Sequence, residues 1–356
     1  MTLSVLPRSE PTGRGRPSVP PTPSIRAAAW PGFATDPPAR RSRTAAADAR
    51  RQAVPLQPCW PALMAGIGAL GEVQARTGQA ACTLAASSPY GRALLCGDQG
   101  HVSGGRLELR LFYAAWARGF AVQEHTANGL QRSLQFFDAQ GLPLHEVTLG
   151  PRSRVPAFDA LVARFAAPAA AQFPQHAANS HAPAACPATR VDPRAFRAGW
   201  ASMRVPQDFY ALLRRHGLTR LAALQLASPE FAQPVDGGAA HEVLARAAQT
   251  GLPLSLCCGN PGAVQTCSGP LHHVEVQGPW LQVNDAGLQL QLREDCIASA
   301  WRVRLPASEG LVSSLELFDA DGRTLAIIGG QRAPGQAERC EWRELLASVA
   351  LEDSPC

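Results

Sequence analysis

The sequence predicts an α+β protein of two tandem repeats, each with a large antiparallel sheet and flanking helices. The first observation behind this prediction is internal similarity: residues 129–144 (GLQRSLQFFDAQGLPL) match residues 310–325 (GLVSSLELFDADGRTL) at an offset of 181, without a gap. Self-similarity at a fixed offset indicates a duplicated structural unit. The second observation is the alternation of apolar and polar residues around both segments, which is typical of strands with one buried and one exposed face.

Two low-complexity segments set the expected domain boundaries. Residues 1–55 contain ten prolines and nine arginines with little hydrophobic periodicity, which favours a disordered extension. Residues 167–190 are rich in alanine and proline, as is typical of a linker. We therefore expect the first repeat over residues 56–166 and the second over residues 191–352.

The two repeats share most of their predicted elements. In the first repeat, alternation predicts strands over residues 107–112, 119–125, 132–138 and 142–149. A short amphipathic helix closes each repeat, over residues 156–166 and 339–349.

The second repeat also has predicted helices near its start. Asp192 and Pro193 are suited to the N-cap and first position of a helix. Pro206 and Gly217 bound a second helix, and residues 241–249 form a third. No matching helices are expected in the first repeat before residue 60.

Composition excludes several classes of protein. The net charge is +5, and all 33 basic residues are arginine. Residues 1–55 carry +6 of this charge, so the remainder sums to −1 and lacks the broad basic surface of a nucleic-acid-binding protein. No apolar run is long enough to predict a membrane span.

The ten cysteines have no C-x-x-C spacing, which argues against a zinc ribbon. The N-terminal residues lack the long apolar core of a signal peptide. We therefore expect a cytoplasmic protein with free thiols. No glycine-rich phosphate loop and no G-x-S-x-G motif is present.

Several motifs in order resemble the HemS/HmuS/ChuS family of haemin-transport and haemin-degrading proteins, over about residues 60–350. They include LELRLFYAAWARGFAVQE (107–124), DFYALLRRHGLTRLAAL (208–224), GNPGAVQ (259–265) and SSLELFDADG (313–322). The resemblance implies two HemS-like repeats, with haem (haem b) held as cargo or substrate in a cleft between a sheet and a helix. It further implies passage of haem from an ABC importer to a haem oxygenase, or its degradation by the protein itself.

The resemblance also implies a set of haem-binding residues. The family's arginines correspond to Arg110, Arg220 and Arg332, and guanidinium groups pair well with the two haem propionates. Haem also needs an apolar slot, for which Phe112, Phe209, Tyr210, Trp301 and alternating leucines are available. The family's iron-binding histidine corresponds to Gln207, and a glutamine amide is a poor iron ligand beside an imidazole.

Three interpretations of this change remain open. A substitute ligand could come from Cys267, Met203, His216 or Tyr210. Haem could instead bind through its propionates and stacking alone, or the chain could be a divergent paralogue that has lost haem binding. His101 and His241 lack partners at metal-binding spacing and are interpreted as surface or structural histidines.

The favoured function is haem binding and trafficking in iron acquisition. The alternative is a haem-degrading, haem-oxygenase-like enzyme, whose redox chemistry the missing histidine weakens. Binding of nucleic acid through the arginine-rich extension is a third, less favoured hypothesis.

Overall fold

The computed structural model describes residues 51–91, 93–96, 98–127, 129–167, 191–333 and 335–351. The predicted extension up to residue 50 and residues 168–190 of the predicted linker lie outside this part of the chain. Residues 51–55, which the sequence assigns to the extension, form strand β1 (Arg51–Pro55) and pair with β7. The first sheet therefore begins earlier in the sequence than expected. An alternating pattern of only five residues is too short to be recognised as a strand next to a proline-rich segment.

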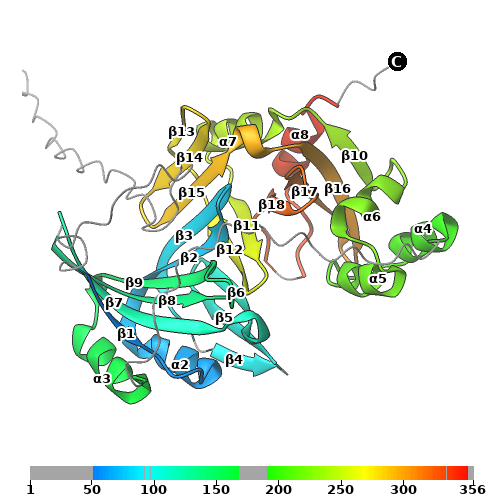
Figure 1. Cartoon of the computed structure of the whole chain (residues 1–356). Coiled ribbons are helices and arrows are strands. Elements are labelled where there is room, and N and C mark those ends of the chain that lie inside the picture. The colour runs from blue at the N-terminus through cyan, green and yellow to red at the C-terminus, as the bar shows by residue number, and fades with distance from the viewer. Residues whose placement is uncertain are drawn as a thin grey trace, which may run out of the picture. The chain divides into compact units, whose positions relative to one another are not determined.

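Two nine-stranded sheets, antiparallel throughout, make up most of the fold (Figure 1). The first sheet has the order β1, β7 (Arg118–Thr126), β8 (Gly129–Phe137), β9 (Pro143–Ser153), β2 (Gly71–Gln79), β3 (Cys82–Pro89), β15 (Leu288–Arg293), β14 (Trp280–Asp285) and β13 (Val274–Gln277). The second has the order β10 (Ala232–Val235), β16 (Ser299–Ala307), β17 (Gly310–Phe318), β18 (Thr324–Gly330), β11 (Leu254–Asn260), β12 (Ala263–Gly269), β6 (Leu107–Phe112), β5 (Gln99–Gly104) and β4 (Ala93–Cys96).

The two sheets have the same strand order and exchange strands with each other. Each contains six strands of one repeat and a three-stranded meander, β4–β6 or β13–β15, of the other. Strands β4, β5 and β6 begin 181 residues before β13, β14 and β15, so the duplication is confirmed down to single strands. The sequence indicates two repeats but does not indicate that they interlock.

One core lies between the sheets and joins the two repeats. Alternate leucines of β6 and β15 are almost completely buried in it. The thiols of Cys82 on β3 and Cys258 on β11 lie 2.7 Å apart within this core. The Gln265 side-chain amide on β12 donates to the backbone carbonyls of Ala75 and Leu84, each at 3.1 Å. The repeats therefore cannot separate without exposing a shared interior.

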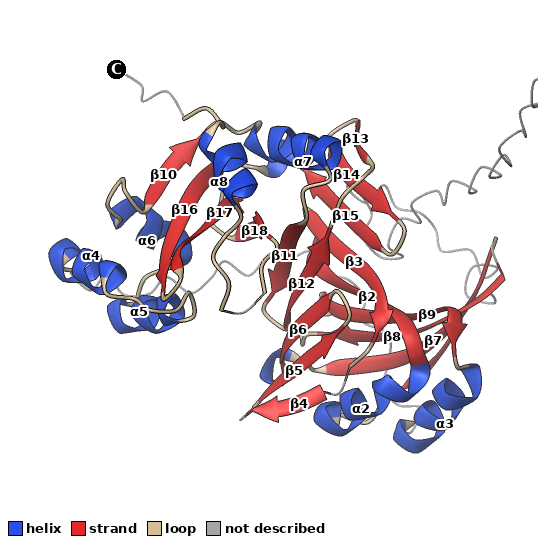
Figure 2. Ribbon diagram, turned by 180° about the vertical axis from the view of Figure 1, so that it is seen from behind, coloured by secondary structure: helices blue, strands red, loops and turns tan. Residues whose placement is uncertain are grey.

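Four helices pack against this shared core (Figure 2). They are α2 (Trp60–Ile67), α3 (Val155–Phe165), α7 (Ala239–Thr250) and α8 (Cys340–Ala347). The predictions for α3, α7 and α8 are confirmed within two residues at either end. Helix α2, the counterpart of α7, was not predicted, because its segment WPALMAGI is apolar on most sides and lacks clear amphipathic periodicity. Short 3-10 turns occupy Gly68–Leu70, Tyr113–Ala115 and Glu294–Cys296.

Helices α4 (Pro193–Ala201), α5 (Asp208–His216) and α6 (Arg220–Leu226) belong to the second repeat and have no counterpart among the described residues of the first. As predicted, Asp192 caps α4, where its carboxylate accepts from the backbone N–H of Arg194 at 2.9 Å. Gly217 ends α5 in the left-handed conformation. A second core, rich in aromatic residues, packs these helices on the outer face of the second sheet: Phe196, Trp200, Phe209, Phe231 and Phe318.

No helix in the described part of the chain is both long and apolar enough to cross a membrane.

Candidate functional site

A cleft with a volume of about 810 Å³ lies where α5 meets the outer face of the second sheet. Pockets for small molecules and cofactors typically span about 300–1,000 Å³. The apolar part of the cleft comes from Leu94, Val102, Leu109, Phe112, Pro206, Val264 and Leu305. The polar part comes from Gln99, His101, Ser103, Glu108, Arg110, Gln207, Tyr210, Arg214, Arg220, Cys257 and Thr266.

Strand alternation places the polar side chains of β5 and β6 in the cleft. Leu107, Leu109 and Leu111 of β6 point into the shared core, so the alternate residues Glu108, Arg110 and Phe112 point outward. His101 on β5 is paired directly with Arg110 on β6 and, on its other side, with Leu94 on β4. Directly paired residues of neighbouring strands share a face, with Cβ atoms about 4.5–5.5 Å apart. The imidazole and the guanidinium therefore leave the sheet side by side.

Helix α5 supplies the other side of the cleft. Gln207 is the N-cap position of this helix, and Tyr210 and Arg214 follow at helical spacing. Residues spaced by three and four positions lie on one face of a helix. The phenol of Tyr210 is half exposed and lies in the cleft with the other two.

Both repeats contribute to this cleft. Strands β4–β6 come from the first repeat, whereas α5, β11, β12 and β16 come from the second. The strand exchange brings these segments together, because β6 pairs with β12. Residues more than 90 positions apart, such as Arg110 and Gln207, thereby line one space.

Arg220 begins α6 and forms a buried ion pair at the edge of the cleft. Its Nε and Nη2 donate to the two carboxylate oxygens of Glu316 on β17, each at 2.6 Å. The guanidinium also lies over the ring of Phe209, 4.9 Å from the centroid. Burial alone would disfavour the charged form, but the Glu316 carboxylate outweighs it and raises the pKa of Arg220. The main partner of this arginine is therefore within the protein.

Two other cations of the cleft have no such partner. Within the described residues, neither Arg110 nor Arg214 donates a hydrogen bond from its guanidinium or forms an ion pair. Both are available to a carboxylate entering the cleft. Arg110 lies on the sheet side and Arg214 on the helix side, so the cleft can receive two separate carboxylates.

Five of the haem-binding residues predicted from the sequence line this cleft together: Arg110, Phe112, Gln207, Tyr210 and Arg220. Phe209 and Trp301 pack in the second core instead. Arg332 does not line the cleft either. It lies in the loop after β18, where its Nη1 donates to the carbonyl of Gln336 at 3.1 Å.

None of the substitute iron ligands Cys267, Met203 and His216 lines the cleft. Cys267 points from β12 into the shared core, and burial raises the pKa of its thiol to about 12. Met203 is buried in the second core. The ring of His216 packs edge-on against Phe196, with the centroids 5.5 Å apart. The alternation of side chains along β12 explains the orientation of Cys267. Because its neighbour Thr266 faces the cleft, Cys267 faces the opposite side of the sheet.

Sequence reasoning missed several polar residues of the cleft, among them Arg214, Cys257 and His101. Arg214 could have been found from its helical spacing after Gln207 and Tyr210. Cys257 pairs with Thr266 on the cleft face of the sheet. His101 was interpreted as a surface or structural histidine, because no metal-binding partner follows it in the sequence; only the pairing of β5 with β6 shows that it lies beside Arg110.

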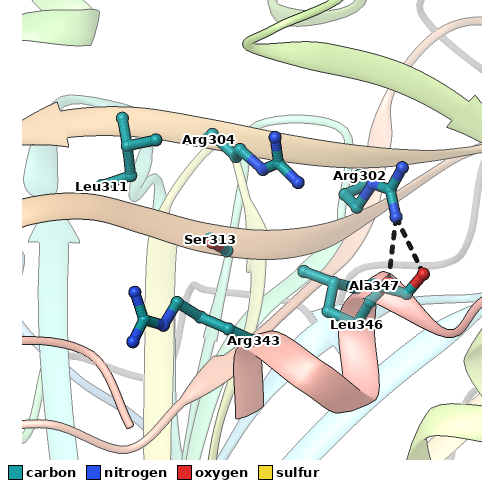
Figure 3. A pocket seen from close by; sticks show the side chains of 7 residues that line it. All are labelled: Arg302, Arg304, Leu311, Ser313, Arg343, Leu346 and Ala347. Carbon is teal, nitrogen blue, oxygen red and sulfur yellow. Dashed lines mark hydrogen bonds between the residues drawn. The ribbon is translucent and has the colours of Figure 1, made fainter. Parts of the chain in front are cut away.

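A second cavity, of about 330 Å³, lies on the opposite face of the second sheet against α8 (Figure 3). Arg302, Arg304 and Arg343 line it. Figure 3 shows the guanidinium of Arg302 turned toward the end of α8, where Nη1 donates to the carbonyls of Leu346 and Ala347 at 3.4 and 3.3 Å. These bonds satisfy carbonyls that a helix end leaves free. Because this cavity is smaller and holds none of the predicted site residues, the cleft beside α5 is the candidate functional site.

The interlocked repeats and the composite cleft define a class of two-repeat binding proteins, and comparison with known proteins identifies the family. The family model described as the haemin-degrading HemS.ChuX domain matches this chain twice, over residues 39–165 and 217–349. The two matches fall on the two repeats, and α4 and α5 of the second repeat lie between them. The chain belongs to this family.

Two curated relatives and two solved structures are similar over most of their length. The chain is 34% identical to hemin transport protein HemS of Yersinia enterocolitica and 35% identical to hemin transport protein HmuS of Yersinia pestis, in each case over 82% of this chain and 84% of the relative. Holo-PhuS, a heme-binding protein from Pseudomonas aeruginosa, is 38% identical, with a TM-score of 0.79 over 84% of this chain and 87% of that one. The heme-degrading enzyme ChuS of Escherichia coli O157:H7 is 31% identical, with a TM-score of 0.77 over the same shares.

Proposed function

We propose that this protein binds haem in the cleft beside α5 and acts in haem trafficking for iron acquisition. The observation that carries the proposal is the pair of guanidinium groups of Arg110 and Arg214, which have no partner among the described residues and lie in a cleft with an apolar lining. Haem is a flat apolar molecule with two carboxylates, so it needs both features. The relatives named as hemin transport and heme-binding proteins support the same ligand.

The residues of the cleft have separate roles in this proposal. Arg110 and Arg214 each pair with a propionate, and a charge-assisted contact of this kind contributes about 1.5–3 kcal/mol. Phe112 and Tyr210 pack against the porphyrin. Arg220 holds α6 to the sheet through Glu316 and thereby fixes the helix side of the cleft, so its role is positioning.

Haem degradation is the second candidate, and the likeness to an enzyme titled as heme-degrading favours it. Bound haem would supply the iron that carries the redox chemistry. The protein would hold it, exclude water and orient it through the residues named above. The sequence-based expectation of a cytoplasmic handover from an ABC importer to a haem oxygenase stays a prediction.

A haemin titration tests the first proposal. Purified protein is titrated with haemin and the Soret band is followed, with the double variant Arg110→Ala, Arg214→Ala as the comparison. We expect a saturable Soret shift for the wild type at micromolar haemin and a much weaker one for the variant. A wild-type protein that leaves the haemin spectrum unchanged would exclude haem binding.

Addition of a reductant to the same complex separates a carrier from an enzyme. A Soret band that persists under ascorbate and air supports trafficking. A band that decays, with an open-chain tetrapyrrole and free iron as products, supports degradation.

A further inference from the structure

We propose that His101 is the protein's axial ligand to haem iron, and that it reaches the iron from the sheet side of the cleft. This inference rests on the proposed haem-binding function and adds to it the residue that holds the metal. The α5 side of the cleft, where Gln207 lies, then provides no iron ligand. The assignment follows from the side chains that line the cleft and from their surroundings.

Only a few side-chain types hold haem iron: imidazole, thiolate, thioether and phenolate. Among the described residues that line the cleft, three carry such a group: His101, Cys257 and Tyr210. His101 carries the only imidazole in that set, and a neutral imidazole ligates without losing a proton from the coordinating nitrogen. The other two must first lose the proton on their sulfur or oxygen.

The surroundings of Cys257 oppose that loss. Burial raises the pKa of its thiol to about 11, and the neighbouring Thr266 hydrogen bond and Arg220 only partly offset this rise. In the haem-free protein the sulfur therefore stays protonated near neutral pH, and ligation by it would have to include the loss of this proton. The sulfur also interacts electrostatically with Arg220 and Glu316. It therefore lies at the edge of the cleft that this ion pair forms.

The surroundings of His101 leave its imidazole available. The side chain is exposed, and within the described residues neither ring nitrogen has a hydrogen bond or ion pair. Its backbone is fixed in the middle of a meander, between β4 and β6. Rigid placement of this kind suits a metal ligand better than a loop does.

The pairing of His101 with Arg110 lets the imidazole bind the iron while the guanidinium binds a carboxylate of the same haem. Because they leave adjacent strands on the same face, a ligand that places its metal against the imidazole also lies beside the guanidinium. One element of the first repeat, the β5–β6 hairpin, would then hold both the iron and a carboxylate. Helix α5 of the second repeat would cover the other side with Gln207, Tyr210 and Arg214.

The test compares ligand variants of the full chain loaded with haemin. His101→Ala, Tyr210→Phe, Cys257→Ser and Gln207→Ala remove the candidate groups one at a time, and His272→Ala removes an exposed histidine that does not line the cleft. The readouts are haemin affinity, the ferric absorption spectrum and the resonance Raman bands that report iron coordination.

We expect only His101→Ala to lose the imidazole-ligated spectrum, with affinity reduced at least several-fold, and we expect added free imidazole to restore the spectrum. The other four variants should keep it. If His101→Ala retains the wild-type spectrum while haemin still binds, the ligand assignment is wrong and haem binding stands. A wild-type protein that binds no haemin overturns both proposals.

Discussion

Arg220 and Glu316 form a two-point ion pair in which Nε and Nη2 each donate to one carboxylate oxygen at 2.6 Å. Glu316 is completely buried, and Arg220 keeps only 15% of its side chain exposed. The pair joins the first residue of α6 to β17 in the second sheet. The family resemblance assigns Arg220 to a haem propionate, whereas the structure gives it a partner within the protein.

Removal of one member of this pair should destabilise the fold. Arg220→Ala leaves a buried carboxylate without its counter-charge, and such losses cost about 3–5 kcal/mol. The double variant Arg220→Met, Glu316→Leu removes both charges and should recover most of this loss. Urea unfolding measures both, with Arg293→Ala, from an exposed pair with Asp295, as the control that should change stability by less than about 1 kcal/mol. Equal stability of Arg220→Ala and the wild type would contradict the structural role.

Haemin affinity should depend on Arg110 and Arg214, the two cleft arginines that have no partner in the described part of the chain. Arg110→Ala and Arg214→Ala should each weaken binding about tenfold, since a lost contact of about 1.4 kcal/mol corresponds to that factor. Because the residues lie on different elements, the double variant should show nearly the sum of the two free-energy changes. Arg194→Ala, an exposed substitution on α4, is the matched control for fluorescence-quenching titrations. An effect of similar size in that control would indicate nonspecific attraction.

Gln207→His should introduce a second imidazole from the helix side of the cleft. We expect tighter haemin binding and a change to a six-coordinate, low-spin ferric spectrum, because two imidazoles would then be available to one iron. Electron paramagnetic resonance distinguishes this state from the wild type. No spectral change would mean that Gln207 does not face the metal position, and the correspondence of Gln207 with the family's iron-binding histidine would be wrong.

Stability should fall in acid through His145. This residue is completely buried, and its ring nitrogens contact the Thr77 hydroxyl at 2.8 Å and the Tyr90 hydroxyl at 3.0 Å. Burial lowers its pKa from 6.5 to about 3, so the unfolded chain takes up a proton at a higher pH than the folded chain does. The native state therefore loses stability as pH falls from about 6.5 toward 3, by up to about 1.4 kcal/mol per pH unit.

The pH dependence of unfolding free energy tests this assignment. His145→Gln should flatten the slope between pH 6.5 and 4, whereas His125→Gln, at an exposed position, should leave it unchanged. An unchanged slope in His145→Gln would assign the acid sensitivity to other groups.

The interlocked repeats should unfold together. Leu109 belongs to the first repeat but lies in the second sheet, where it is 2% exposed. Leu109→Ala should cost about 2–5 kcal/mol and should shift one shared transition, because both repeats enclose the same core. Circular dichroism and tryptophan fluorescence should give coincident unfolding curves. Two separate transitions would contradict a single core.

Local sequence patterns predicted many of the helices and strands, and the matching segments predicted the duplication. The strand at residues 107–112, the Asp192 cap of α4 and the glycine end of α5 all follow from local rules, since alternation, capping and left-handed glycine depend on neighbouring residues. Part of the cleft was also predictable: Arg110, Gln207 and Arg220 follow from the family resemblance, and Phe112 and Tyr210 from the need for an apolar slot.

Tertiary structure alone decided how the repeats combine and which groups face the ligand. Strands β3 and β12 occupy equivalent positions in their repeats. Each pairs with a meander of the other repeat, and the residues of the two strands do not by themselves predict this pairing. The pairing of β6 with β12 places the β5–β6 hairpin, and with it His101 and Arg110, across the cleft from α5. Helix α6 places Arg220 against Glu316 of β17. Contacts between residues distant in sequence depend on which sheet edges and which strand faces meet when the whole core is buried. A local pattern of apolar and polar residues does not determine which strands pair.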